Sequence, residues 1–303
     1  MSAIEEKRSG SLLQQWVVGD VRITKMVETE NIIDMLTFFP KASAEALLAI
    51  PWLRPHFVTA EGQAIFSIHA LVVETPTKRI IVDTCYGNDK DRMPWEFITN
   101  LQTSFLRDLE AAGFQRDSID TVLCTHLHVD HVGWNTMLVD GRWMPTFPKA
   151  RYILNKLEYD YWVAPVDVPT ANAWNEIQRL TIADSVTPVF EAGLVDLVEG
   201  TYKVCDEVTL VPTPGHSPGH VSVRISSRGK EALITGDIAH HPSQLVYLDW
   251  GLDIDFNQEQ AANTRRHVFS DVANRPILVI GTHWAGTTGG AIKRDGQSFR
   301  LEY

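Results

Sequence analysis

The chain has 303 residues, of which 44% are hydrophobic and 21% charged, and its formal net charge is -11. This composition allows a large buried core and excludes a disordered chain, and the acidic balance argues against a nucleic-acid partner, which would need a basic face. Cys85, Cys124 and Cys205 have neither metal-binding nor redox spacing, which favours free thiols in a reducing compartment.

The first 62 residues are predicted to contain a loose arm, a strand pair and an irregular aromatic-rich segment. The arm, residues 1–10, lacks the apolar stretch of a secretion signal, and no run approaches membrane-spanning length, so we expect a cytoplasmic protein without a membrane partner. The alternating residues 16–28 predict two strands joined at Gly19-Asp20, and residues 41–50 predict a short helix. The aromatic-rich segment, residues 31–62, is a candidate lid or dimer contact, or else a packed loop, and we expect a homodimer.

Beyond residue 62, predicted strands and helices are mixed, and polar residues follow the strand ends. No linker divides the chain, so we expect a single domain over residues 1–303. Helices are predicted at 105–114, which ends near Gly113, and at 256–273, which begins near Asp255 or Asn257. Residues 152–162 pass from strand to helix, and the other strands are predicted at 64–75, 79–84, 121–125, 207–214, 220–226, 231–237, 276–283 and 299–303.

The stretch THLHVDHVGW, residues 125–134, concentrates three histidines and an aspartate directly after an apolar strand. His126 and His128 are two residues apart at the end of an extended segment, so their side chains point to the same side. Asp130 and His131 follow on the turn, so all four groups can converge on one small volume. When neutral imidazoles are crowded together, their acceptor nitrogens find few hydrogen-bond donors. This favours a metal site over isolated structural histidines.

Three distant segments add further ligating groups. His216 in TPGHSPGH, Asp237 in ITGD and His283 in GTH each lie in a short turn after an apolar run. Loops at strand ends carry chemistry on a rigid scaffold, so these side chains are expected to join the first cluster. Because a catalytic metal site needs about three protein ligands and an open position, the combined set suffices for two ions.

In this order, HLHVDH at 126–131, PGH at 214–216, GD at 236–237 and TH at 282–283 resemble the metallo-β-lactamase superfamily of dinuclear hydrolases. The resemblance implies an α/β fold, a four-layer αββα sandwich with the metals at one edge of the paired sheets. It also implies two ligand sets with Asp237 between the ions: His126, His128 and His216 in the first set, and Asp130, His131 and His283 in the second.

Within that superfamily the chain differs from several branches. The related antibiotic-degrading lactamases use a cysteine near the position of Asp237, and the flavin-linked diiron reductases place an acid where His128 stands. The ligand set is similar to that of the acyl-homoserine lactonases, and HSPGH with GDIAH is similar to methyl parathion hydrolase. The resemblance therefore implies hydrolysis of small neutral esters or lactones, with organophosphate triesters as promiscuous substrates.

Residues near these motifs are candidates for supporting roles. Metal-bound imidazoles usually donate their second N–H to a carboxylate or carbonyl, and Asp83 at a strand end is a candidate acceptor of this kind. His220 is predicted to support the ligands from behind or to anchor the backbone. His240 is predicted to orient a ligand, with a place facing the substrate or in a solvated loop as alternatives. Trp134 and Trp284 follow the motifs of His131 and His283 and are predicted to line an apolar substrate pocket, although packing in the core explains a tryptophan equally well.

The expected chemistry is hydrolysis by a hydroxide held between two divalent ions, without a serine or cysteine nucleophile. Zinc is the default for a histidine-rich site, with manganese, iron and cobalt as alternatives. Asp130 and Asp237 are predicted to fix the ions and to relay the proton to the leaving group. Two other readings stay open: a one-iron thiol or persulfide dioxygenase of the same superfamily, and a binding protein with a vestigial site.

Overall fold

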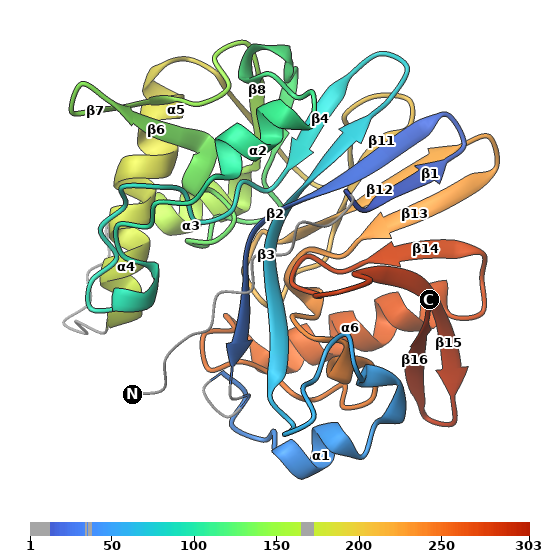
Figure 1. The fold of residues 1–303 in the computed structure, drawn as a ribbon. Helices are drawn as coiled ribbons and strands as arrows, with labels where there is room; N and C mark the ends of the chain where they lie inside the picture. Colours follow the sequence, from blue (N-terminus) through green and yellow to red (C-terminus); the bar gives the residue numbers. More distant parts are fainter. Residues whose placement is uncertain (1–12, 34, 36–37, 165–172) are drawn as a thin grey trace.

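The computed structural model describes residues 13–33, 35, 38–164 and 173–303. The predicted arm over residues 1–10 lies outside the described residues. Two seven-stranded sheets form the centre of the molecule, and helices lie on their outer faces (Figure 1). Within the described residues, no helix is long and apolar enough to cross a membrane.

The first sheet is built from the N-terminal half of the chain, in the order β1-β2-β3-β4-β5-β8-β9. β4, β5, β8 and β9 run parallel to one another, so their carboxyl ends meet at one edge. β2 contains a bulge between Val27 and Thr29 where it pairs with β3. β1 spans Gln15–Val18, β2 Val21–Ile33, β3 Ala64–Glu74, β4 Arg79–Val82, β5 Thr121–Leu123, β8 Arg151–Asn155 and β9 Val195–Val198.

The second sheet is built from the C-terminal half, in the order β10-β11-β12-β13-β14-β15-β16. All its pairings are antiparallel except that of β13 with β14. Its strands span Tyr202–Lys203, Val208–Pro212, Val221–Ser227, Lys230–Ile234, Ile277–Ile280, Gly289–Asp295 and Ser298–Glu302 in chain order. A separate hairpin pairs β6, Thr136–Val139, with β7, Arg142–Pro145.

The helices are short apart from α6. Their bounds are Ala44–Leu48 for α1, Phe105–Ala111 for α2, Lys156–Val163 for α3, Ala173–Thr181 for α4, Thr187–Glu191 for α5 and Gln258–Val272 for α6. A π-helical turn, Ile182–Val186, joins α4 to α5. Turns of 3-10 helix span Pro51–Leu53, Glu96–Ile98, Arg116–Ser118, Gly133–Asn135, Gly236–Ile238 and Pro242–Leu245.

Three apolar layers explain the stacking of the two sheets. Side chains alternate across a strand, so on β3 Leu71 points into the layer between the sheets while Ala70 and Val72 point outward. The outer layer of the first sheet is closed by α2 and α5, and that of the second sheet by α6. Both faces of the sheets are therefore buried, and the structure confirms the predicted αββα sandwich.

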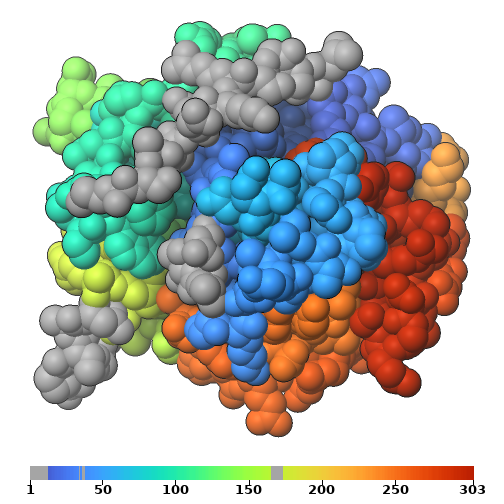
Figure 2. All heavy atoms as spheres, turned by 60° about the horizontal axis from the view of Figure 1, so that its bottom comes forward, coloured from blue at the N-terminus to red at the C-terminus, as the bar shows by residue number. Residues whose placement is uncertain are grey.

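The aromatic-rich segment predicted as a lid or dimer contact packs on the chain itself. Leu47 and Phe57 are fully buried in the same apolar layer as Phe269 of α6. Figure 2 shows this segment in light blue against the orange and red surface of the C-terminal half. Residues 34, 36 and 37 of the segment lie outside the described residues. The predicted homodimer and the single-domain boundary stay predictions.

The main elements lie where the sequence predicts them, but several end earlier. β5 ends at Leu123 and β13 at Ile234, so His126 and Asp237 lie in loops a few residues beyond their strands. The β6–β7 hairpin, α4, α5, β9, β10 and β15 were not predicted from the sequence.

Candidate metal centre

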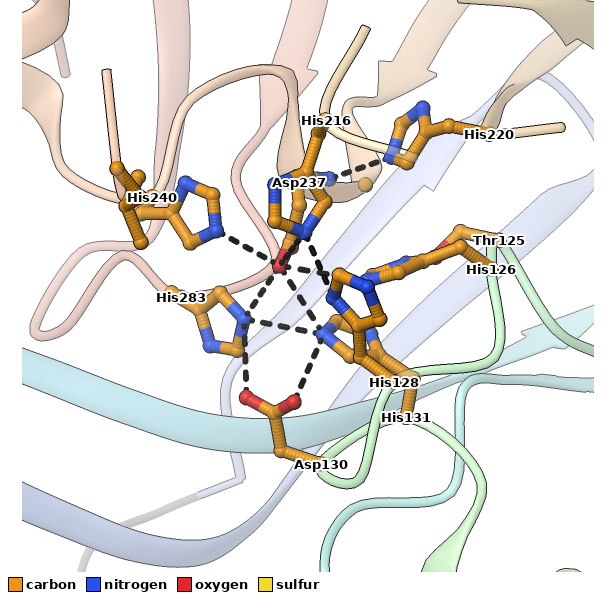
Figure 3. Close-up of polar contacts among 12 residues, drawn as sticks. Thr125, His126, His128, Asp130, His131, His216, His220, Asp237, His240 and His283 are labelled. Carbon is orange, nitrogen blue, oxygen red and sulfur yellow. Dashed lines mark hydrogen bonds and ion pairs between the residues drawn. The ribbon is translucent and has the colours of Figure 1, made fainter. Parts of the chain in front are cut away.

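Loops from both sheets converge at one edge of the sandwich. His126, His128, Asp130 and His131 lie in the loop after β5 of the first sheet. His216 lies between β11 and β12, Asp237 follows β13, and His283 follows β14 of the second sheet. Figure 3 shows all seven side chains pointing toward a common centre, with Asp130 and His283 on one side and His128 and His216 on the other.

The donor atoms form overlapping groups of the size a metal ion needs. His126, His128 and His216 form one group, and Asp130, His131 and His283 form another, with the ligand atoms of each group within 4.8 Å of one another. Asp237 forms a third group with His126 and His131. The structure thus brings together all seven residues that the sequence predicts as ligands.

The Asp237 carboxylate occupies the middle of the cluster. Its Oδ2 atom lies 3.2 Å from His131 Nε2 and 3.1 Å from His283 Nε2. The same atom lies 3.7 Å from His126 Nε2 and 3.6 Å from His216 Nε2, in the other group. Asp237 is therefore placed to share one carboxylate between the two groups.

The donor set fits a bound cation better than it fits hydrogen bonds among the side chains. His126 Nε2 and Asp237 Oδ1 are buried without a partner in the described residues. His216 Nε2 faces His128 Nδ1 at 2.9 Å, and His131 Nε2 faces His283 Nε2 at 3.2 Å. Facing lone pairs on neutral imidazoles are repulsive unless a proton or a cation lies between them, so the cluster is suited to metal ions.

Burial and nearby charges shift the pKa values of the histidines in the cluster in different directions. Burial, with the neighbouring histidines, lowers the pKa of His126 and His128 well below the ordinary value, which leaves both as neutral ligands. Burial also lowers the pKa of His131, but Asp237, Asp130 and Asp83 outweigh it and raise that pKa well above normal. A cation at His131 would therefore replace a proton that the carboxylates attract.

In four of these histidines, the Nδ1 atom contacts a polar group outside the cluster. The Asp83 carboxylate accepts from His131 Nδ1 at 3.0 Å, and its other oxygen accepts the Thr125 backbone N–H at 2.8 Å. Asp255 accepts from His216 Nδ1 at 2.7 Å. His283 Nδ1 lies 3.3 Å from the Ser67 carbonyl, and His126 Nδ1 lies 3.1 Å from Thr125 Oγ1. These partners fix the ring orientations, as second nitrogens of ligating histidines require.

His220 and His240 occupy different places around Asp237. His220 Nε2 accepts the Asp237 backbone N–H at 2.8 Å, so its Nδ1 carries the proton and donates to the Thr213 carbonyl at 3.0 Å. Burial lowers the pKa of His220 to about 3, so it stays neutral and anchors the Asp237 turn. His240 Nε2 lies 3.0 Å from Asp237 Oδ2, and His240 forms a fourth group of possible metal donors with His216 and Asp237.

A family model described as the metallo-beta-lactamase superfamily matches residues 65–280, well over half of the chain. The chain belongs to this superfamily. The match includes the residues of the cluster up to Asp237, while His283 lies just beyond its end.

Solved structures of the superfamily share this fold over nearly the whole chain. The hydrolase AbOPH superposes with a TM-score of 0.80 at 22% identity, covering 97% of this chain and 98% of that one. AidC, a dizinc quorum-quenching lactonase, superposes with a TM-score of 0.75 at 19% identity, covering 96% of each chain. These likenesses show the fold.

Curated relatives match a shorter part. A probable metallo-hydrolase of Mycobacterium tuberculosis is 26% identical over 64% of this chain, and the match spans 65% of that relative. An N-acyl homoserine lactonase of Bacillus thuringiensis is 27% identical over 44% of this chain and 43% of its own length.

The two tryptophans predicted to line the substrate pocket are core residues in this superfamily member. Trp284 is fully buried and donates its indole N–H to the Ala239 carbonyl at 2.9 Å. Trp134 is 4% exposed, stacks on Phe105 and donates to Glu28. Of the two alternatives for each tryptophan, the structure favours packing in the core, because each indole N–H finds a partner in the interior and each ring fills an apolar layer.

Other aromatic residues contact the cluster instead. The ring centroids of Trp174 on α4 and Trp162 on α3 lie 4.8 and 5.4 Å from that of His128. Trp95 continues this surface, with its ring centroid 5.6 Å from that of Trp174. Sequence reasoning missed Trp162, Trp174 and the His216 partner Asp255, because none of them lies in a ligand motif and only the packing of α3, α4 and the turn before α6 brings them near.

Proposed function

We propose that this chain is a dinuclear metal-dependent hydrolase of small neutral esters or lactones. The observation that carries the proposal is the position of Asp237 Oδ2 between two groups of donors, 3.1 Å from His283 and 3.6 Å from His216. One shared carboxylate with about three further ligands on each side is the arrangement that a pair of divalent ions requires.

Each ligand has a role in this proposal. His126, His128 and His216 would hold one ion, and Asp130, His131 and His283 the other, with Asp237 shared. Two ions, zinc by default for this donor set, would supply an activated water and polarise the substrate carbonyl. Asp255 and Asp83 keep the Nδ1 protons of His216 and His131, which leaves each Nε2 free to ligate.

Asp130 marks the open side of the centre. Its side chain is 21% exposed, whereas the Asp237 side chain is 3% exposed, so substrate would approach at Asp130. Its Oδ2 lies 3.5 Å from His283 Nε2, and we propose that Asp130 takes a proton from the attacking water and passes it to the leaving oxygen. Trp174, half-buried beside His128, would exclude water from an apolar arm of the substrate.

Two solved structures with the same fold are described as lactone-hydrolysing enzymes, which supports this assignment. AidC is solved in complex with a product, N-hexanoyl-L-homoserine, and a second solved lactone hydrolase has the same product at its catalytic metal centre. We propose a neutral small-molecule substrate for this chain as well, and promiscuous hydrolysis of phosphotriesters in view of the resemblance of HSPGH and GDIAH to methyl parathion hydrolase.

Metal counting with a substrate panel tests the proposal. The purified protein is expected to hold two divalent ions per chain and to hydrolyse members of a panel of lactones, aryl esters, phosphotriesters and thioesters. Asp237→Asn and His128→Ala should abolish turnover, while His267→Ala, on the exposed face of α6, should not. One iron per chain with consumption of oxygen and a thiol would instead identify a dioxygenase and would overturn the hydrolase assignment.

A further inference from the structure

Glu158 is a buried carboxylate that belongs to neither ligand group. It lies in the first turn of α3, is fully buried, and has no described role in holding Asp237 or any histidine ring. It accepts hydrogen bonds from two backbone N–H groups and one indole N–H, and the Ser217 side chain also interacts with it; none of these groups is charged. A buried carboxylate among neutral donors is costly unless it is fully hydrogen-bonded, so its position needs a reason beyond packing.

The partners of Glu158 lie in two separate ligand loops. Oε1 accepts the backbone N–H of Leu127, at 3.3 Å, between His126 and His128. Oε2 accepts the backbone N–H of Gly219, at 2.8 Å, in the turn that contains His216. One carboxylate therefore joins the two loops that together supply the first ligand set.

The contacts around these two loops leave little room for adjustment. A Cβ atom on Gly219 would lie 2.4 Å from the Glu158 backbone nitrogen, so the turn packs directly on the start of α3. The carbonyl of Leu127 accepts from Gln178 Nε2 of α4 at 3.2 Å, and Gln178 is 1% exposed. The Leu127 residue is thus held on its N–H by α3 and on its carbonyl by α4.

Glu158 also fixes a ring beside the first ligand set. It accepts the Trp162 indole N–H at 2.6 Å, and the Trp162 ring centroid lies 5.4 Å from that of His128 in an edge-on arrangement. The His128 ring is therefore bounded by an aromatic ring whose orientation the same carboxylate determines.

We propose that Glu158 is a positioning residue that fixes the His126–His128 segment relative to the His216 turn and so sets the metal affinity of the first ligand set. This inference rests on the proposed function. The second ligand set has its own supports, Asp83 behind His131 and Ser67 behind His283, which do not involve Glu158.

Glu158→Gln is the variant that tests it, because glutamine keeps the size of the side chain. Both carboxylate oxygens accept hydrogen bonds, so the amide nitrogen of glutamine must face an N–H donor in one of the two loops. We expect zinc affinity of the first set to fall about 10- to 100-fold, as for other groups that orient metal ligands, with the second set unchanged.

The measurement is a Zn²⁺ titration of the metal-free protein followed by histidine ring ¹⁵N NMR, which reports His126, His128 and His216 separately from His131 and His283. Glu28→Gln is the matched control. Glu28 accepts from Trp134 Nε1 at 2.7 Å and from the Tyr86 N–H at 2.8 Å, so it contacts neither the His126–His128 segment nor the His216 turn, and its replacement should leave the first set unaffected. Thermal unfolding of both metal-free variants measures any general loss of stability.

The outcomes separate this inference from the proposed function. Unchanged zinc affinity in Glu158→Gln, or an equal loss at both sets in both variants, overturns the positioning role. A wild-type chain that binds no zinc overturns the proposed function and this inference with it. If Glu158→Gln does not fold, Gln178→Met removes the other hydrogen bond to Leu127, and it must weaken the first set selectively for the inference to stand.

Discussion

Replacement of Asp255 by asparagine should weaken metal binding at His216 without altering any ligand. The Asp255 side chain is 1% exposed, and its Oδ1 accepts from His216 Nδ1 at 2.7 Å. Its Oδ2 accepts the Leu252 backbone N–H at 2.9 Å. Burial raises the pKa of Asp255, but the hydrogen bond and charge of His216 outweigh it and lower that pKa, so Asp255 is ionised in the folded protein.

Asparagine offers one acceptor where aspartate offers two. If its oxygen keeps the Leu252 N–H, its amide N–H₂ faces His216 Nδ1, which must then accept, and the ring proton moves to Nε2, the atom that faces the metal centre. A charge-assisted hydrogen bond contributes about 1.5–3 kcal/mol. At about 1.4 kcal/mol per factor of ten, zinc affinity of the first set should fall roughly 10- to 150-fold.

The assay is competition for Zn²⁺ between the protein and a chromophoric chelator, with Asp253→Asn as the control on the same turn, where the side chain is exposed. Turnover measured at saturating zinc should recover much of the loss, because the mutation acts on affinity. If Asp255→Asn binds zinc as tightly as the wild type, the proposed function of the Asp255–His216 pair is refuted.

Three further predictions concern other parts of the molecule. Gly133→Ala should lower the free energy of unfolding by roughly 3 kcal/mol or more in chemical denaturation, because the added Cβ would lie 1.8 Å from the Tyr86 carbonyl oxygen. Gly141→Ala, whose Cβ would meet nothing within 4 Å, measures only the cost of its left-handed backbone at φ 74°, and a Gly133→Ala loss no larger than this contradicts the reasoning. Burial lowers the pKa of Lys90 from 10.5 to about 7, so between pH 7 and 10.5 only the unfolded chain keeps this proton and the free energy of unfolding rises with pH. Lys90→Met should remove up to about 1.4 kcal/mol per pH unit from the slope of that free energy against pH, and an unchanged slope would contradict the lowered pKa. Trp174→Leu should raise KM for substrates with an apolar arm while metal content and kcat stay near wild type; an equal loss for substrates without such an arm would show that Trp174 does not bind the arm.

The convergence of the seven predicted ligands could be predicted from sequence because the pattern that indicates it is local. The spacing of His126, His128, Asp130 and His131 fixes four groups on one turn, and His216, Asp237 and His283 each follow a recognisable apolar strand. The αββα fold followed from the family resemblance, whereas the position of β3 between two apolar layers is a finding of the structure.

The surroundings of the cluster could not be predicted in the same way. Asp255 reaches His216 from 39 residues away along the chain, and Gln178 reaches Leu127 from 51 residues away. Trp134 and Trp284 are adjacent to ligand motifs in sequence, yet their rings pack into the interior. Such contacts depend on how α3, α4 and the turn before α6 pack, and no local pattern of residue types determines that packing.

The division of the ligands between the two sheets has a consequence for how the protein is made. A nascent chain that has emerged as far as residue 155 contains His126, His128, Asp130 and His131 but none of the ligands from the second sheet. Any ion captured at that stage would be held by an incomplete set, and His283 emerges last. Under the proposed function, full loading would therefore follow synthesis of nearly all of the chain, and a truncation before β14 would remove His283 from the proposed second ligand set even if the first sheet had folded.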